Sequence, residues 1–160
     1  MKDSKLLVDF KIYLRQKKEY FKKLFQLSKQ HKSCINNEEL ERVNDVFEKK
    51  DKIIKKIKKI DSDNLKLIED IKELYSLRDK GWLSKLAQKD DLNQNLKIKI
   101  NKLVEIIKKY TKSEKENKQL LEEWYNNMGV ELGKINKGIK TNKFYNKKDR
   151  IYSTFIDKKS

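Results

Sequence analysis

The sequence contains no proline and only four glycines, although these residues form most of the tight turns between β-strands. β-Sandwiches, β-barrels and doubly wound sheets need such turns at short intervals, so these fold classes are excluded. The single cysteine excludes a disulfide-bonded scaffold, and the low glycine and proline content excludes a collagen-like chain. The 160 residues suit one domain. What remains is a helical or a disordered chain, and the spacing of apolar residues decides between them.

The sequence also lacks a long uninterrupted apolar stretch. Charged residues interrupt the segment 1–16 before the apolar region of a secretory signal could form. No later stretch reaches the apolar length that a membrane span requires. The single cysteine, Cys34, cannot form an internal disulfide, which fits a reducing compartment. We therefore expect a soluble protein of the cytoplasm.

Arginine is scarce, although the chain carries 41 lysine and arginine residues against 25 aspartate and glutamate residues. The net charge of +16 indicates an anionic partner, such as nucleic acid or an anionic surface. Arginine would bind phosphate through two parallel hydrogen bonds, but nearly all of these cations are lysines. The densest lysine cluster comprises Lys49, Lys50, Lys52, Lys55, Lys56, Lys58 and Lys59. We favour a solvated bundle face for this cluster, and nucleic acid binding is the alternative.

Apolar residues recur in alternating steps of three and four along three long segments. This is the spacing of helices that pack against other helices. The first segment extends from Leu6 to Cys34, and the second from Leu40 to Ile60. The third begins near Asp90 and continues to Ile135, which corresponds to about 60 Å of helix. Adjacent apolar stripes widen these faces beyond a two-stranded seam, so the pattern favours a bundle.

Shorter signals mark the connections between these helices. Asn36 or Asn37 is expected to cap the second helix, with Glu38–Glu39 in its first turn. A shorter apolar-periodic piece covers residues 65–77, and the pattern weakens into an expected turn at residues 80–82.

A few charged and polar residues interrupt the apolar stripes. Lys17 is the one charged residue on the first stripe. Glu114 and Asn117 follow one another on the third, which predicts looser packing at mid-helix. The whole pattern predicts an all-α fold of long antiparallel helices that form an elongated bundle or hairpin. We assign residues 1–139 to this helical bundle and residues 140–160 to a flexible basic C-terminal tail.

No catalytic constellation is recognisable. His31 and Cys34 are the only histidine and cysteine, and both continue the apolar stripe of the first helix, so we interpret them as packing residues. Two such residues do not complete a zinc site, and no glycine-rich phosphate-binding motif occurs. We therefore expect no enzyme activity, no metal and no cofactor.

A broad apolar face lies near the end of the third helix, and no amphipathic helix follows it to cover it. The face comprises Leu120, Leu121, Trp124, Met128, Leu132 and Ile135. Such residues usually belong to a core. A helix of another protein could also pack there, because methionine and tryptophan side chains adapt to different partners. We predict that this face binds a partner helix, with core packing as the alternative.

The order of these elements resembles the FlgN/FliT-type flagellar export chaperones. A long helix, the turn Cys34-Ile35-Asn36-Asn37-Glu38 and a helix with the charged stretch EKKDKIIKKI match their general shape. The last long helix is similar in carrying Asn117 just before Leu120-Leu121. The most specific part is the end, LGKINKGIKTNKFYNKK followed by YSTFIDKKS. Its matching residues are Gly133, Gly138, Tyr145, Phe155, Ile156 and Asp157.

The resemblance implies a function without catalysis. It implies a cytosolic chaperone of the flagellar type III export system that binds hook-associated or filament-cap subunits before export. Exposed amphipathic ends of such subunits would associate early unless a partner covered them. The resemblance also implies contact with the export gate, for which Tyr145 is the candidate residue because basic residues and Phe144 flank it in a segment without helical repeat. A structural coiled-coil homodimer is a further alternative.

Overall fold

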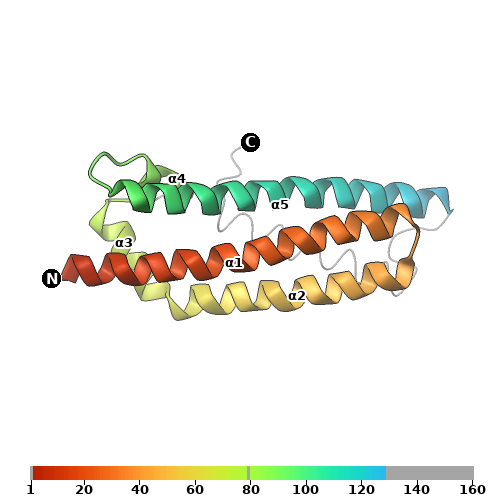
Figure 1. Ribbon diagram of the computed structural model, residues 1–160, viewed down its shortest axis with the longest axis horizontal. Coiled ribbons are helices and arrows are strands. Elements are labelled where there is room, and N and C mark those ends of the chain that lie inside the picture. Colours follow the sequence, from red (N-terminus) through yellow and green to blue (C-terminus); the bar gives the residue numbers. More distant parts are fainter. Residues whose placement is uncertain (1, 79, 129–160) are drawn as a thin grey trace.

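The computed structural model describes residues 2–78 and 80–128, and these form an elongated bundle of helices (Figure 1). The long helices are α1 (Lys2–Asn36), α2 (Leu40–Asp63) and α5 (Gln94–Asn127). Each runs antiparallel to the long helix before it, so α1 and α5 are parallel and α1 lies between α2 and α5 in the view of Figure 1. The predicted all-α bundle of long helices is confirmed.

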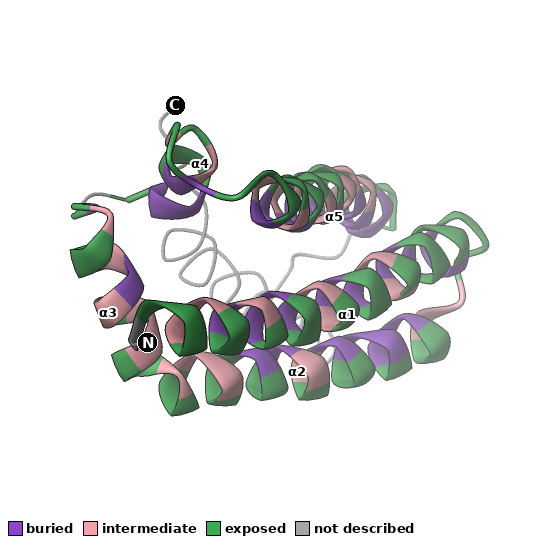
Figure 2. Cartoon of the chain, turned by 60° about the vertical axis from the view of Figure 1, so that its left-hand side comes forward, coloured by how far each residue is buried: buried purple, intermediate pink, exposed green. Residues whose placement is uncertain are grey.

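The apolar stripes read from the sequence form the core. In Figure 2 the buried parts of each long helix lie on the sides that face the other helices, and the outer sides are exposed. The stripe residues that are at most 5% exposed include Phe10, Tyr13, Leu24, Phe47, Ile54, Ile57, Leu96, Ile100, Leu103 and Ile107. Burial of these side chains, at ~25 cal/mol per Å² of apolar surface, stabilises helices of moderate intrinsic propensity.

The turn between α1 and α2 shows that the N-terminal cap expected for the second helix at Asn36 or Asn37 is wrong. Asn36 is the last residue of α1, and the residue that precedes α2 is Glu39, whose side chain makes no capping hydrogen bond. The turn is closed instead by Glu38, which has a φ of 57° in the left-handed region. The helix α1 extends this far because Cys34 and Ile35, in its last turn, are buried in the core.

Two short helices connect α2 to α5 at the end of the bundle that carries the N-terminus (Figure 1). The helix α3 (Leu65–Leu74) follows α2 after a break at Asn64. The helix α4 (Trp82–Ala87) packs against α5, and it was not expected from the sequence. The turn expected at residues 80–82 is present at Gly81, whose φ of 75° suits glycine because a Cβ atom would be strained there.

The helix α5 begins with a side-chain cap, since the Asn95 backbone N–H donates to Asn93 Oδ1 at 2.7 Å. Its 34 residues span about 51 Å. The predicted continuation to Ile135 and the predicted tail at residues 140–160 lie outside the described residues, so the boundary at residue 139 stays a prediction. Within residues 2–78 and 80–128, no helix combines the length and the apolar character needed to cross a membrane.

Candidate functional site

A buried ion pair joins α2 to α5 in the middle of the bundle. Lys50 Nζ lies 2.7 Å from one carboxylate oxygen of Glu114 and 2.9 Å from the other. The same ammonium is 2.7 Å from His31 Nδ1 on α1, so one cation connects all three long helices. His31 also meets the Phe47 ring edge-on, with 4.3 Å between centroids. Complete burial lowers the pKa of Lys50, and the nearby Glu114 carboxylate opposes this shift.

Asn117 extends this cluster one turn further along α5. Its side-chain Nδ2 donates to the backbone oxygen of Ser28 at 2.8 Å and lies 3.0 Å from the Ser28 hydroxyl. The Ser28 and Ser113 hydroxyls are 2.6 Å apart. The looser packing predicted at mid-helix is therefore wrong, because Glu114 and Asn117 are at most 2% exposed. Hydrogen bonds between helices replace the apolar contacts that these positions lack.

A second charged group lies on the apolar stripe of α1. Lys17 is buried and contacts Asp61 at the end of α2, at 3.1 Å. The Tyr13 hydroxyl donates to the same carboxylate at 2.6 Å, and Lys17 Nζ is 3.0 Å from this hydroxyl. Burial lowers the pKa of Lys17 to about 8, an effect that the Asp61 carboxylate only partly offsets. Burial and Asp61 both raise the pKa of Tyr13. The two polar clusters thus link α2 to α1 at two places, through Lys17–Asp61 and through His31–Lys50.

Some residues of the predicted partner-binding face on α5 are buried in the structure, and others are exposed. Leu121 and Trp124 are buried, with 1% and 8% of their surface exposed. Leu120 is half-buried and Met128 is 45% exposed. The Trp124 ring stacks on Tyr125 with 5.7 Å between centroids. The remaining members of the face, Leu132 and Ile135, lie outside the described residues, as does Tyr145.

His31 and Cys34 lie where the sequence places them, on the buried side of α1. His31 is fully buried and is held by Lys50. Cys34 is a free thiol that is 7% exposed. In the described part of the chain, no group of three or more histidine, cysteine, aspartate or glutamate residues is arranged to hold a metal ion.

The lysine cluster of α2 is not a single surface. Lys50 belongs to the core and is unavailable to phosphate, whereas Lys49, Lys52 and Lys56 are exposed. Lys55 forms an ion pair with Asp51 at 3.1 Å. The structure thus separates residues that are adjacent in sequence, because successive helical positions point about 100° apart.

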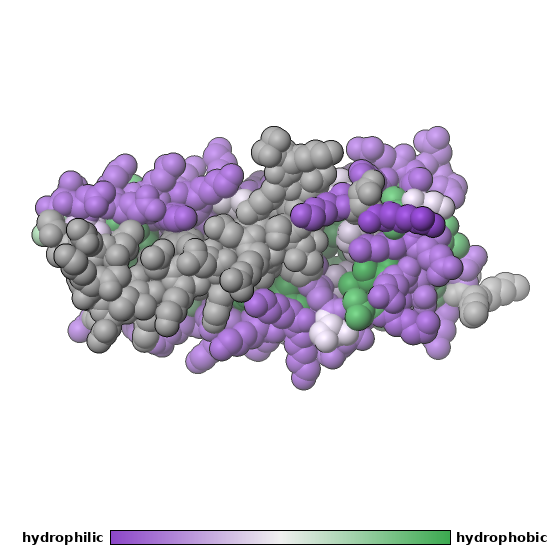
Figure 3. Space-filling view, turned by 180° about the vertical axis from the view of Figure 1, so that it is seen from behind, coloured by the Kyte–Doolittle hydropathy of each residue, from purple (hydrophilic) through white to green (hydrophobic). Residues whose placement is uncertain are grey.

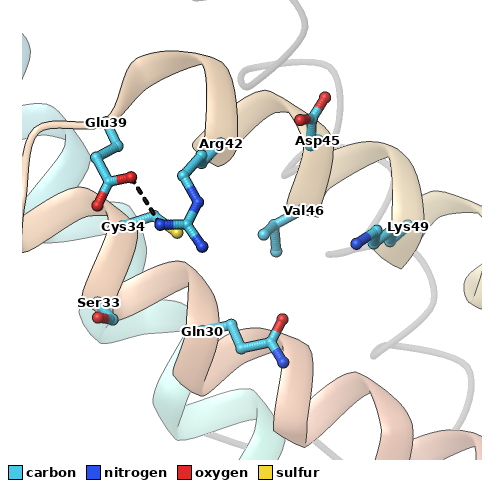
Figure 4. A pocket seen from close by; sticks show the side chains of 8 residues that line it. All are labelled: Gln30, Ser33, Cys34, Glu39, Arg42, Asp45, Val46 and Lys49. Atoms are coloured by element: carbon cyan, nitrogen blue, oxygen red, sulfur yellow. Dashed lines mark hydrogen bonds and ion pairs between the residues drawn. The ribbon is translucent and has the colours of Figure 1, made fainter.

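The exposed lysines border a groove between α1 and α2. Toward the α1–α2 turn the groove has a volume of about 210 Å³ (Figure 4). There Arg42 and Val46 of α2 reach toward the side of α1 that carries Cys34, and Arg42 pairs with Glu39 at 2.8 Å. Toward mid-helix a second pocket of the same groove, which shares Lys49 with the first, has a volume of about 510 Å³ and is lined by Leu27 among other residues. In the view from behind the molecule, the described side chains that are visible beside the grey residues are mostly hydrophilic, and hydrophobic ones emerge near the end that carries α3 and α4 (Figure 3).

The polar partners Asp61 and Ser28 were missed by sequence reasoning. A signal was present, because Lys17, Lys50 and Glu114 occupy stripe positions where apolar residues are expected, and a charge there requires a partner. The spacing along the chain does not show which residue this partner is.

Comparison with protein-family profiles matches residues 6–151 to the family described as FlgN protein. The match therefore includes all of α2, α3, α4 and α5 and most of α1. Comparisons with curated proteins and with solved structures found no match.

Proposed function

Because the chain belongs to the FlgN family of flagellar export chaperones, we propose that it escorts hook-associated or filament-cap subunits to the export gate in the cytoplasm. The family match over residues 6–151 carries this proposal. A chaperone of this kind acts by binding alone, and its cargo is an amphipathic helix that must remain covered until assembly.

We place the cargo contact on the apolar face of α5. Met128 and the half-buried Leu120 are the described members of this face that a partner can reach without opening the core. In the sequence, Leu132 and Ile135 continue the face at helical spacing. A flexible methionine adapts to the apolar side chains of more than one subunit.

The test measures cargo affinity by calorimetry with a purified hook-associated subunit and, separately, a filament-cap subunit. Met128→Ser and Leu120→Ser are each expected to weaken binding about fivefold to tenfold, since each removes about 1 kcal/mol of apolar contact. Ile98→Ser is the matched control, because Ile98 lies on α5, which Met128 caps at its end, and is 44% exposed, close to the 45% of Met128. Equal affinities for the Met128 and Ile98 variants would exclude this face.

Trp124→Ala is a less direct probe of the same face. Since Trp124 is 8% exposed, its truncation is expected to lower the free energy of unfolding as well as cargo affinity. Unfolding by urea must therefore be measured beside binding. Lost stability with unchanged cargo affinity would assign Trp124 to the core alone.

We place the export-gate contact at Tyr145. From residue 134 onward the chain has nine lysine and arginine residues against two aspartates, so this segment would approach an acidic surface rapidly and the aromatic ring would supply specificity. Tyr145→Ala should abolish binding to the purified gate domain and reduce motility, with cargo affinity unchanged. Tyr152→Ala is the control within the same segment. Wild-type gate binding by the Tyr145 variant would show that this residue has no such role.

A further inference from the structure

The groove between α1 and α2 combines an apolar floor with a strongly basic rim. Leu27 of α1 and Ile53 of α2 are half-buried in its mid-helix pocket, which has a volume of about 510 Å³. The rim carries five exposed lysines and one acidic residue, Glu19. The lysines are Lys22 and Lys23 on α1 and Lys49, Lys52 and Lys56 on α2.

Most of this positive charge is uncompensated within the described chain. Lys22 has a weak pair with Glu19 at 3.6 Å, and Lys23 lies over the Tyr20 ring. No carboxylate of residues 2–78 and 80–128 lies within ion-pair distance of Lys49, Lys52 or Lys56. The three are spaced so that they share one side of α2, and they leave the half-buried Ile53 between them accessible.

We propose that this groove binds an acidic amphipathic helix of another protein. An apolar side chain on each of two successive turns of the partner would contact Leu27 and Ile53, and flanking carboxylates would pair with the lysines on both helices. This surface is separate from the α5 face and does not depend on it for binding.

The charge distribution argues against a second copy of this chain, or a segment of the same chain, as the occupant of the groove. The net charge of the whole chain is +16, so a second copy meets a repulsive field. The residues from 134 onward carry nine lysine and arginine residues against two aspartates, and they have the same sign as the groove. Nucleic acid matches the charge, but its phosphates would leave the apolar floor without a partner.

The probe is a fluorescein-labelled helical peptide of about four turns, with leucines at positions i and i+4 and glutamates on both flanks. Two further probes separate the contributions of apolar contact and charge. One is the same peptide with serines in place of the leucines, and the other is a DNA duplex of equal total charge. Anisotropy titrations with the full chain are made near physiological ionic strength, where exposed charges beyond ~8 Å are screened.

The variant Lys52→Glu/Lys56→Glu should weaken binding of the leucine peptide about tenfold or more, since two attractive charges become repulsive. Lys58→Glu/Lys108→Glu is the matched control, because it changes the net charge equally at exposed positions outside the groove. The control should change affinity less than about twofold. Ile53→Ser should also weaken peptide binding, with the helical circular dichroism unchanged.

Three results would overturn the proposal. The first is an equal loss of affinity in the groove variant and the control variant, which would indicate a general charge effect. The second is binding of the serine peptide as tight as that of the leucine peptide. The third is a DNA duplex that binds more tightly than the leucine peptide and depends on the same two lysines, which would make the groove a nucleic acid site. None of these results bears on cargo binding at α5.

Discussion

The buried pair Lys50–Glu114 provides the sharpest test of how the bundle is held together. Replacing Glu114 by leucine leaves the Lys50 ammonium fully buried, with His31 as its remaining partner among the contacts described above. Removing one member of a buried ion pair typically destabilises a protein by about 3–5 kcal/mol, because an uncompensated charge remains in the core. Small domains have free energies of unfolding of about 5–15 kcal/mol. The variant should therefore lose a large part of its stability.

Replacing both charges at once should be far less damaging. In Lys50→Met/Glu114→Leu no buried ion remains at this site, and the two apolar side chains occupy similar volumes. The double variant still removes the Nδ1 partner of the buried His31, which costs about 1–2 kcal/mol. We therefore expect the double variant to lose no more than about 2 kcal/mol, less than either single variant.

The assay is urea unfolding followed by circular dichroism, with the four free energies combined in a double-mutant cycle. The matched control is Glu105→Leu, since Glu105 pairs with Lys109 at 3.1 Å on the exposed side of the same helix. The control should change stability by less than about 1 kcal/mol. A loss below about 1 kcal/mol in Glu114→Leu, or losses that simply add in the double variant, would refute the reasoning.

Three further predictions concern single positions. The pKa of Lys17 is about 8 in the folded chain and 10.5 ordinarily, so between these pH values the unfolded chain binds more protons than the folded chain and stability rises with pH. The melting temperature of the wild type, relative to that of Lys17→Met, should therefore rise from pH 7.5 to pH 10, and a constant difference between the two would contradict this. Gly81→Ala should lower the free energy of unfolding by about 1 kcal/mol because its φ is 75°, whereas no loss in urea unfolding would contradict strain there. Asn93→Ala removes the cap on Asn95 and should cost about 1 kcal/mol by the same assay, with Asn93→Asp as the conservative control.

The helices and their inward faces were predictable from local pattern. Alternating steps of three and four identified α1, α2 and α5, and the residues on those steps, such as Phe10 and Leu103, are buried. The family resemblance was also readable, because it depends on the order of elements and on short stretches of sequence, and the FlgN match over residues 6–151 confirms it. The helix α4 was missed because its six residues are too few to show a helical period of apolar residues.

The partners of the inward polar residues were decided only by the tertiary structure. A lysine on an apolar stripe indicates that a counter-charge is needed, but Lys50 and Glu114 are 64 positions apart, and Lys17 and Asp61 are 44 apart. Which residues meet depends on how far each helix extends before it turns and on its register against its neighbour. Periodicity specifies the face of one helix, whereas an ion pair or a groove between two helices requires the position of both, and that information exists only in the packed bundle.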